Sequence, residues 1–564
     1  MNETGGLFPF RLAWIIPVAA VVTLGLGVWA WTDQHQPLDE ALYRSVALFD
    51  IDGNAYSHGE ALQDWRFRVG RWTGAGVVLS SLLALAALLH EHLATGLARW
   101  TKQAVVVVGS APLALTAYEA ARRTGRSTLW LGAAGFGSAS FRDIALAWPQ
   151  RERARAVHEY AREADHVLVV DVDDAEALSL ARAARAAAPT AQITVLMRDV
   201  RLAEDAAATL NQSRTRVLST AAVAARALAT VHPPFLIARE HGHARIHALI
   251  VGFGQTGQAI ARDLMVNCRT TYLGLPRITV IDPQARALEG VLRVRAPEID
   301  DCAESLFIDG EIGGRAVRPD PQTIARDLAA GGPITVAYVC LTDDVSALSA
   351  ASMLQSLLRA VDIAQPPIFV RLREAQVLAE GGGGRSLDAL TPFGELDTVL
   401  TASEFLSDAP DAAARAFCEA YRASLPAAER DDPTNRSAFP WDRLDETWRQ
   451  ANRDAVAHID AKLASAGIDP ARWQGGSGLP RLAPGERLFH GHSDLEALAM
   501  LEHERWMAQR RMDGWRRTEA PSKDETRRLH PSLKGYAALT DEVKEYDRVF
   551  VRQTQRAVTG EIDE

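Results

Sequence analysis

Three glycines near the middle of the chain have the spacing of a dinucleotide-binding turn. Gly252, Gly254 and Gly257 follow the apolar run 248–251 as G-x-G-x-x-G, and a helical pattern continues from Gln258. In such a turn the first glycine permits a tight bend, the second admits a pyrophosphate, and the third packs helix against strand. The N–H groups at the start of the helix favour an anion. The stretch therefore predicts a Rossmann unit with a nucleotide site.

The next expected strand ends in an acidic residue. Arg277 to Asp282 is such a strand, and a carboxylate at its end can bind ribose hydroxyls. The gap from Gly252 exceeds the usual spacing of roughly 20 residues, so we expect a small insertion over Asn267–Leu275.

A second group of residues with usable chemistry lies near the C-terminus. Aromatic rings and histidines there would stack on a flat base, and arginines would contact a phosphate. The alternative is that the rings form the core of a small two-helix module that docks another protein. The histidines lack metal spacing and cysteine partners, so neither a metal site nor a catalytic residue is predicted. The candidate ligand-binding residues are His503, Trp506, Arg510, Trp515, His530 and Tyr536.

The bulk composition limits the classes of protein. The chain has 564 residues, too many for one hydrophobic core, so several domains are expected. Its formal net charge of −10 argues against a nucleic-acid partner, which needs a basic surface. The four cysteines include no C-x-x-C pair and predict a reducing compartment without a zinc site. Cys340 lies in an apolar run and is expected to be a buried hydrophobic residue.

Two uncharged runs near the N-terminus are long enough to cross a bilayer. They cover about residues 12–32 and 72–89, against the roughly 20 residues that the hydrocarbon core requires. The first is too long for a cleaved signal peptide, and tryptophans near the run ends suit the lipid interface. Two spans put both termini on one side, which lone thiols and Rossmann patterns identify as the cytoplasm. Arg99 and Lys102 favour this orientation, whereas Arg66, Arg68 and Arg71 oppose it.

The loop between the two runs, residues 33–71, contains no T-V-G-Y-G-like potassium filter. It contains a short amphipathic pattern that predicts a helix over Ala41–Phe49. A potassium-selective pore is therefore not the favoured interpretation.

Alternating strands and helices follow the second run and predict two doubly wound parallel sheets in tandem. In the first unit Ala111 and Ala114 stand where the fingerprint has glycines, which predicts a degenerate copy. Thr342-Asp-Asp344 should cap a helix, and Val169 to Asp174 repeats this turn in the first unit. Strands are expected over Gln103–Gly109, Ser127–Leu131, His166–Val170, Ile193–Met197, Ala248–Val251, Arg277–Asp282, Leu306–Gly310, Ile334–Asp344 and Pro367–Leu372.

Residues 247–345 resemble the nucleotide-binding RCK (TrkA-N) domains that regulate potassium channels and transporters. The resemblance implies a site for NAD or an adenine nucleotide and pairing of such domains, hence a homo-oligomer, a dimer or a tetramer. Residues 104–220 resemble the same family with the fingerprint eroded. The residues that carry the likeness, and the candidate cofactor-binding set, are Gly252, Gly254, Gln255, Gly257, Asp282, Asp309 and Asp343.

Residues 494–556 resemble the repeat found in ryanodine receptors and in bacterial proteins that contain this domain. The resemblance implies no catalytic chemistry and a sensor module for nucleotide-derived small molecules. The matching positions are His503 to Trp506, Gly514-Trp515, Lys523-Asp524, His530-Pro531, Leu533, Tyr536, Leu539 and Asp547-Arg548.

The expected fold class is α/β, with two transmembrane helices, two tandem Rossmann-like domains and a small all-α C-terminal module. The expected domains are a transmembrane region over 1–102, a degenerate Rossmann domain over 103–240, a second Rossmann domain over 241–405, a helical linker region over 406–492 and a ryanodine-receptor-type domain over 493–560.

These patterns predict a nucleotide-sensing regulatory protein, not an enzyme, anchored in the bacterial inner membrane with cytoplasmic C-terminal domains. Its expected partners are the lipid bilayer, a nucleotide-type ligand and further copies of itself, and potassium ion transport is the expected process. One alternative is a ligand-gated channel or pore formed by oligomerised spans. Another is an NAD-dependent oxidoreductase, but the sequence offers no recognisable set of acid, base and substrate pocket for one.

Overall fold

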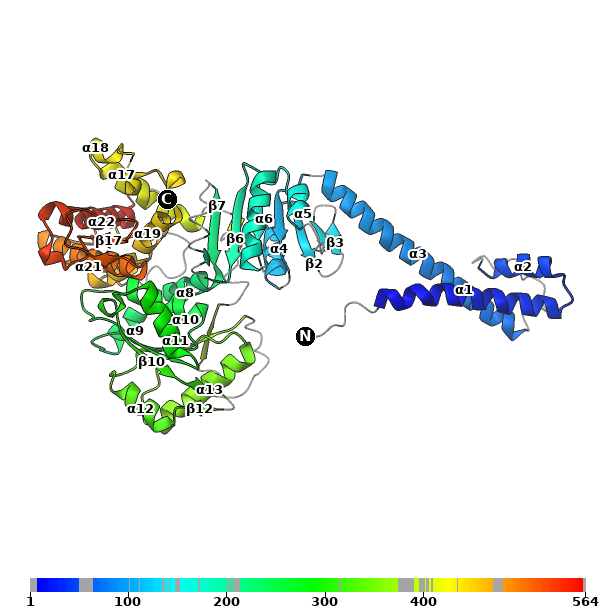
Figure 1. The fold of residues 1–564 in the computed structure, drawn as a ribbon, viewed down its shortest axis with the longest axis horizontal. Coiled ribbons are helices and arrows are strands. Elements are labelled where there is room, and N and C mark those ends of the chain that lie inside the picture. Colours follow the sequence, from blue (N-terminus) through cyan, green and yellow to red (C-terminus); the bar gives the residue numbers. More distant parts are fainter. Residues whose placement is uncertain are drawn as a thin grey trace. The chain divides into compact units, whose positions relative to one another are not determined.

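The computed structural model describes residues 8–560 apart from 50–63, 101, 111, 134–136, 141–142, 148–152, 171–172, 200–201, 204–205, 207–213, 314–315, 374–389, 395–400, 402–404, 407–408, 434 and 470–479. The chain forms two compact units, Met1–Thr101 and Lys102–Glu564. Each unit is described by itself (Figure 1).

The first unit is helical. Its elements are α1 (Phe8–Asp33), α2 (Leu38–Val46), the 3-10 turn η1 (Ala47–Phe49) and α3 (Trp65–Trp100). The predicted helix over Ala41–Phe49 corresponds to the second half of α2 and to η1. Helices α1 and α3 lie side by side, with α2 packed against α1.

Small residues let the segment after α2 approach this helix pair closely. The side chain of Leu48 is buried against Gly27 and Gly70, where a Cβ atom would meet it. The hydroxyls of Thr23 and Thr73 are 2.8 Å apart and link α1 to α3. The pair is thus held by close packing and a polar contact between the helices.

Two described stretches have the length and composition of a membrane span, Ile16–Asp33 and Thr220–Glu240. The first overlaps with the predicted span 12–32. The second contains Leu228 and Phe235, which are buried in the core around the second sheet, so we assign it to that core. The predicted span 72–89 lies within α3, where side chains after Leu85 are outside the described residues.

The first sheet of the second unit has seven strands in the order β3-β4-β2-β1-β5-β6-β7. All neighbours are parallel except β3 and β4. Four of its strands match the predicted ones, and β3, β4 and β7 are additional. The strands are β1 (Val105–Val108), β2 (Thr128–Ala133), β3 (Gly137–Ser140), β4 (Asp143–Ala147), β5 (His166–Val169), β6 (Gln192–Met197) and β7 (Thr215–Ser219), and the helices are α4 (Leu113–Arg123), α5 (Arg153–Tyr160) and α6 (Asp174–Ala187).

The second sheet has six parallel strands in the order β10-β9-β8-β13-β14-β15. When its strands are numbered from β8 onward, this is the 3-2-1-4-5-6 order of a Rossmann fold. The first sheet repeats it once the β3–β4 pair is taken as the third position, which supports the predicted duplication. The strands are β8 (His247–Val251), β9 (Arg277–Asp282), β10 (Glu304–Asp309), β13 (Val336–Val339), β14 (Ile368–Arg371) and β15 (Leu390–Phe393).

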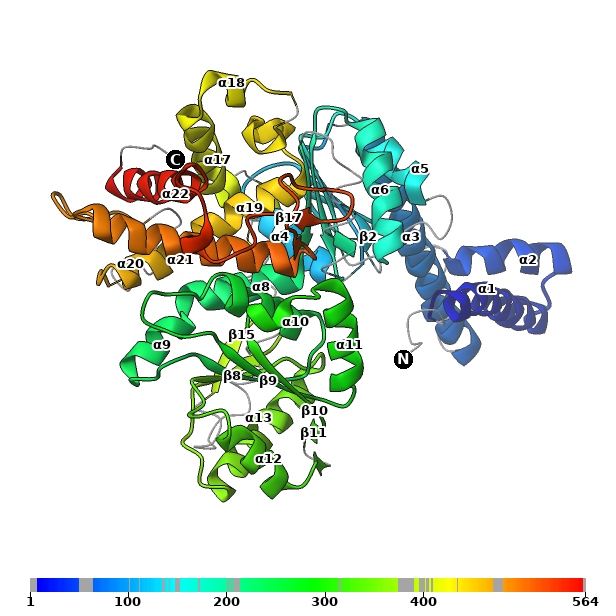
Figure 2. The same cartoon turned by 60° about the vertical axis from the view of Figure 1, so that its left-hand side comes forward.

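Helices cover both faces of the second sheet (Figure 2). Helix α8 (Thr220–Val231), which follows the last strand of the first sheet, packs on α10 (Gln255–Val266) of the second. This contact joins the first Rossmann-like domain to the second. The remaining elements are α9 (Pro234–Glu240), α11 (Ala285–Arg295), η4 (Ile299–Asp301), α12 (Pro321–Ala329), α13 (Asp344–Ala360) and a two-strand ribbon of β11 (Glu311–Ile312) and β12 (Val317–Arg318).

A helical region precedes the C-terminal module. It comprises α17 (Ala409–Ser424), α18 (Ala427–Arg430), η5 (Arg436–Ala438), η6 (Trp441–Arg443), α19 (Glu446–Ala457) and α20 (Ile459–Ser465). The predicted insertion over 267–275 is irregular, and the helical region packs against it. Ser465 Oγ accepts from Thr271 N at 3.1 Å, and His458 Nε2 lies 3.0 Å from the Arg269 carbonyl oxygen.

The C-terminal module is built on two long helices, α21 (His492–Met512) and α22 (Asp541–Thr559). Between them lie η8 (Tyr536–Ala538) and a parallel pair of two-residue strands, β16 (Arg516–Arg517) and β17 (Leu529–His530), so the module is helical with a small addition of strand. Helix α21 lies against α10 (Figure 2). Ala508 and Met512 of α21 share one apolar core with the second sheet.

Candidate functional site

The glycine turn joins β8 to α10, and its three glycines meet different surroundings. Gly252 has φ +88°, a conformation that favours glycine. A Cβ atom on Gly257 would overlap the carbonyl oxygen of Gly252, so this position needs close approach of helix to strand. A Cβ atom on Gly254, at the N-terminus of α10, would meet open space. The turn therefore has the shape of a phosphate cradle, with its open side at Gly254.

Asp282 ends β9 beside this turn. Its carboxylate accepts from the N–H groups of Phe253 and Gln284, both at 2.8 Å. Each oxygen keeps a second lone pair for a ribose hydroxyl, because a carboxylate can accept about four hydrogen bonds. The structure thus gives Asp282 a role in fixing the glycine turn, beside the binding role that the sequence predicts.

The remaining acidic candidates lie at the same edge, because the carboxyl ends of parallel strands meet there. Asp309 ends β10, is exposed, and accepts from Arg286 N at 2.8 Å. Asp343 precedes α13 and accepts from Ser346 N at 2.8 Å, the helix cap that the sequence predicts. Hydrogen bonding to this N–H lowers the pKa of Asp343, so it is a stable anion.

Gln255 connects the glycine turn to the first sheet. Its side-chain amide donates to Asp199 Oδ2 at 3.1 Å, and Asp199 follows β6. The candidate site of the second Rossmann-like domain is therefore bordered by the carboxyl edge of the first sheet.

The corresponding turn of the first Rossmann-like domain has a tryptophan ring packed beside it. The indole N–H of Trp130 donates to the Gly109 carbonyl at 2.9 Å, and the ring packs 5.7 Å from that of Tyr118. Ala114 is fully buried, and Ala111 lies outside the described residues. The buried indole beside this turn is in line with the prediction that the first Rossmann-like domain is a degenerate copy.

The module brings all six candidates into one cluster, in which the Tyr536 ring lies 6.0 Å from that of His503. Trp506 stacks on His503 with ring centroids 5.4 Å apart and meets His530 edge-on at 5.0 Å. Trp515 lies 6.0 Å from His530. Arg510 lies over Trp515 at 5.5 Å and Trp506 at 6.0 Å.

Tyr536 and His503 are engaged within the module. The Tyr536 hydroxyl donates to Glu496 at 3.1 Å. His503 is buried, with Nε2 2.9 Å from the Lys534 carbonyl and Nδ1 3.0 Å from Asp547. Since a carbonyl only accepts, Nε2 carries a hydrogen. Burial raises the pKa of Asp547.

Arg510 is the unusual member of the cluster. Only 5% of the residue is exposed, and its buried Nε atom has no hydrogen-bond partner among the residues that the structure describes. Burial lowers its pKa, and that of His530 to about 4. In the described part of the chain no carboxylate pairs directly with Arg510, and Asp513, Asp445 and Glu525 raise its pKa only from a longer distance. A cation kept among aromatic rings in this way has capacity left for an anion.

Sequence reasoning missed one residue of this cluster. The ring of Trp448, on α19, lies 4.6 Å from the Arg510 guanidinium, the shortest of its three contacts with tryptophans. Trp448 belongs to the helical region before the module, and only the run of Phe439, Trp441 and Trp448 hinted at an aromatic surface there.

With this geometry established, the comparisons with known proteins can be stated. Residues 491–560 match the RyR domain. The predicted resemblance of the C-terminal module is thereby confirmed, and the RyR domain consists of α21, α22 and the segment between them. No curated protein matches the chain.

Solved structures similar to the chain include two of GsuK and one synthase. "GsuK Channel" has 12% identity and a TM-score of 0.36 over 70% of this chain and 96% of that chain. "GsuK channel bound to NAD" has 11% identity and a TM-score of 0.35 over 70% and 84%. Dipicolinate synthase A chain from Bacillus subtilis has 13% identity and a TM-score of 0.21 over 55% and 94%.

Proposed function

We propose that this protein is a membrane-anchored regulator that senses nucleotide-type ligands. The observation that carries the proposal is the glycine turn. Gly257 packs against the Gly252 carbonyl, Gly252 has a positive φ, and Gly254 has open space beside it at the start of α10. This arrangement fits the pyrophosphate of NAD or the phosphates of an adenine nucleotide. The residues that would hold it are Gly252, Gly254, Gln255, Gly257, Asp282, Asp309 and Asp343.

Contacts of α10 support transmission from this site to the RyR domain. The N-terminus of α10 forms the cradle, while Arg262 further along binds Asp454 of α19 at 2.9 Å. Ala508 and Met512 of the RyR domain share the apolar core of α10. A ligand that favours one position of α10 would therefore change the free energy of these contacts.

The N-terminal unit supplies the proposed anchor. Apolar side chains on α1 and α3 face outward, as contact with lipid requires. We propose that both helices cross the bacterial inner membrane and that the second unit is cytoplasmic, with potassium ion transport as the process regulated. The exposed apolar residues include Val18, Val21, Trp29, Trp72, Leu79 and Leu83.

A regulatory role is favoured over oxidoreductase activity by how the acidic residues are used. Asp343 caps a helix and Asp282 fixes a turn. Both are thereby engaged as acceptors of backbone hydrogen bonds, and neither is placed as a proton donor to a reacting group.

Calorimetric titration of the full-length protein in detergent with NAD, NADH and ADP tests the proposal. We expect one of them to bind through the glycine turn. If none releases or takes up heat and none co-purifies, the proposal is wrong. Ion flux through reconstituted protein that depends on the bound ligand would instead favour a ligand-gated channel.

A further inference from the structure

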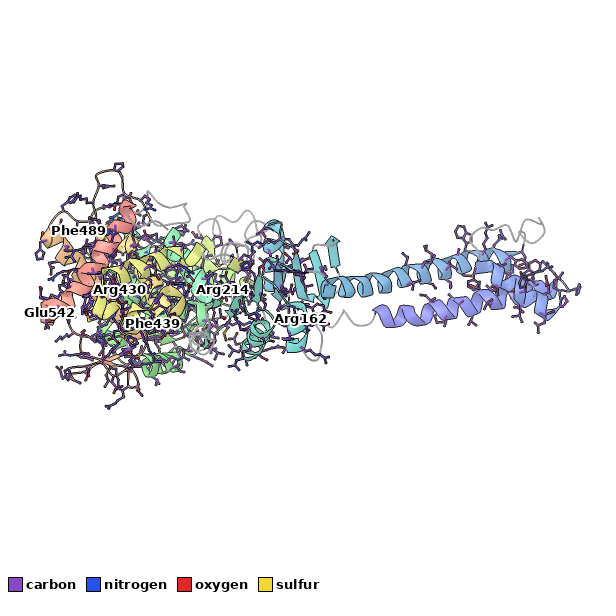
Figure 3. All side chains as sticks on the ribbon, turned by 90° about the horizontal axis from the view of Figure 1, so that it is seen from above. Arg162, Arg214, Arg430, Phe439, Phe489 and Glu542 are labelled. Atoms are coloured by element: carbon purple, nitrogen blue, oxygen red, sulfur yellow. The ribbon has the colours of Figure 1, made fainter. Side chains whose placement is uncertain are left out.

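A cavity of about 270 Å³ lies in the helical region, outside the residues that match the RyR domain. It is lined by Arg436, Phe439, Arg443, Asp445 and Trp448, from η5, η6 and the start of α19. Figure 3 labels Phe439 on this yellow segment.

One wall of this cavity is shared with the RyR domain. Trp448 lines the cavity and also lies 4.6 Å from the guanidinium of Arg510. Arg436 contacts Glu525, in the segment between α21 and α22, at 3.7 Å. The cavity and the aromatic cluster are therefore two sides of one boundary between the helical region and the RyR domain.

The charge of this boundary favours an anion. Arg436 and Arg443 line the cavity, and the guanidinium of buried Arg510 contacts the ring of Trp448. Two carboxylates lie near them: Asp445 lines the cavity and accepts from Trp448 N at 3.1 Å, and Glu525 contacts both Arg436 and Lys523. The three arginines thus outnumber these two carboxylates, which leaves a net positive charge near the cavity.

The cavity also offers rings for a flat ligand. Phe439 and Trp448 line it, and the Arg443 guanidinium lies 4.7 Å from the Phe439 ring. Aromatic and guanidinium planes stack on nucleobases and contribute about 1–3 kcal/mol per base. At about 270 Å³ the volume is near the lower limit of roughly 300 Å³ for small-molecule pockets, which suits a mononucleotide and not a dinucleotide.

We propose that the cavity between the helical region and the RyR domain binds a nucleoside monophosphate. The phosphate binds Arg436 and Arg443, and the base stacks on Trp448, whose other neighbour is Arg510. The class of ligand rests on the proposed function, but the site is separate from the glycine turn. The helical region thus supplies a binding wall that the RyR domain does not contain.

The test is titration of the full-length protein with AMP in the presence of excess NAD, which occupies the glycine turn and is too large for the cavity. We expect Trp448→Leu and Arg443→Ala each to weaken AMP binding by about tenfold or more, and NAD binding to change by less than about twofold. Arg430→Ala is the matched control, because Arg430 is a partly exposed arginine of the same region that does not line the cavity (Figure 3).

The outcomes separate the two proposals. Unchanged AMP binding in both cavity variants, or no AMP binding by the wild-type protein, overturns the cavity proposal even when NAD binds. Loss of AMP binding in those variants supports it even when NAD does not bind, a result that would overturn the glycine-turn proposal instead. Adenosine and inorganic phosphate, titrated separately, should each bind more weakly than AMP.

Discussion

At the scale of single residues, the glycines of the turn differ in what a methyl group would meet. Gly257→Ala places its Cβ against the Gly252 carbonyl, whereas Gly254→Ala places it in open space. We expect Gly257→Ala to lower the free energy of unfolding by about 1–3 kcal/mol. Gly254→Ala should change it by less than about 0.5 kcal/mol, yet weaken NAD binding by about tenfold.

Urea unfolding and calorimetry on both variants check this pair of expectations. The proposed ligand geometry is wrong if Gly254→Ala binds NAD as tightly as the wild-type protein does. The packing argument is wrong if Gly257→Ala is as stable as Gly254→Ala.

Arg510 is a buried cation surrounded by three tryptophans. Removing it from water costs several kcal/mol, and each cation–π contact returns about 0.5–2 kcal/mol, so the two effects nearly cancel. We expect Arg510→Met to leave the free energy of unfolding unchanged or slightly raised. Arg510→Ala should lower it by about 2–4 kcal/mol, because a cavity remains among the rings.

Chemical denaturation distinguishes these two substitutions of Arg510. A loss above about 2 kcal/mol in Arg510→Met would reveal that the guanidinium is held by a stabilising contact within the fold. In that case Arg510 would have no capacity left for a ligand.

At the scale of elements, α21 is attached to α20 by a buried ionic cluster. Glu502 contacts Lys462 and Arg505, each at 2.7 Å, and all three side chains are at most 3% exposed. Glu502→Ala would leave two cations without their anion, and we expect a loss of about 3–5 kcal/mol in the free energy of unfolding. Glu542→Ala, on an exposed position of α22, should change it by less than about 0.5 kcal/mol.

Thermal and urea unfolding of Glu502→Ala and Glu542→Ala measure this difference. Similar stability of the two variants would mean that the cluster contributes no more than a surface charge does.

The junction of α19 and α20 predicts a dependence of stability on pH. His458 is fully buried beside Lys462, Glu502 and Arg505, and burial lowers its pKa from 6.5 to about 4. The unfolded chain therefore binds a proton that the folded chain does not. The contribution to stability is complete above about pH 6.5 and is lost as the pH falls towards 4; at about pH 5 the loss is about 2 kcal/mol.

His458→Gln isolates this contribution, because Gln does not titrate and can still donate to the Arg269 carbonyl. Between about pH 7 and pH 5 the wild-type protein should lose about 2 kcal/mol more than the variant does. The comparison cancels Asp460, whose pKa burial raises to about 6 and which acts in the opposite direction. Parallel pH profiles of the two proteins would contradict the assignment.

At the scale of the whole molecule, the two units should behave differently in a cell. Apolar side chains of α1 and α3 face outward, while Lys102–Glu564 has its own cores. We expect the full chain to stay in the membrane fraction after a carbonate wash and to dissolve in detergent. Residues 102–564 alone should remain in the supernatant after ultracentrifugation. Release of the full chain by carbonate would contradict the proposed spans.

The sequence alone determined which segments form the parallel sheets and where the glycine turn lies. Continuous apolar strands, positive-φ glycines and capping aspartates act over a few residues, so local patterns are enough to predict β8, β9 and the cap at Asp343. The RyR match likewise depends on a contiguous stretch, residues 491–560. A four-residue strand such as β15, after a long connection, lacks such a pattern and was not predicted.

Only the tertiary structure decided which distant side chains meet. The Arg510 guanidinium lies over Trp448, Gln255 donates to Asp199, and Glu502 of α21 pairs with buried Lys462 of α20. The two members of each pair are separated by 40 to 62 residues, and nothing in their local sequence specifies a partner. Packing of whole helices on sheets fixes such contacts, because it is decided by apolar faces that cover one another and not by neighbouring residues.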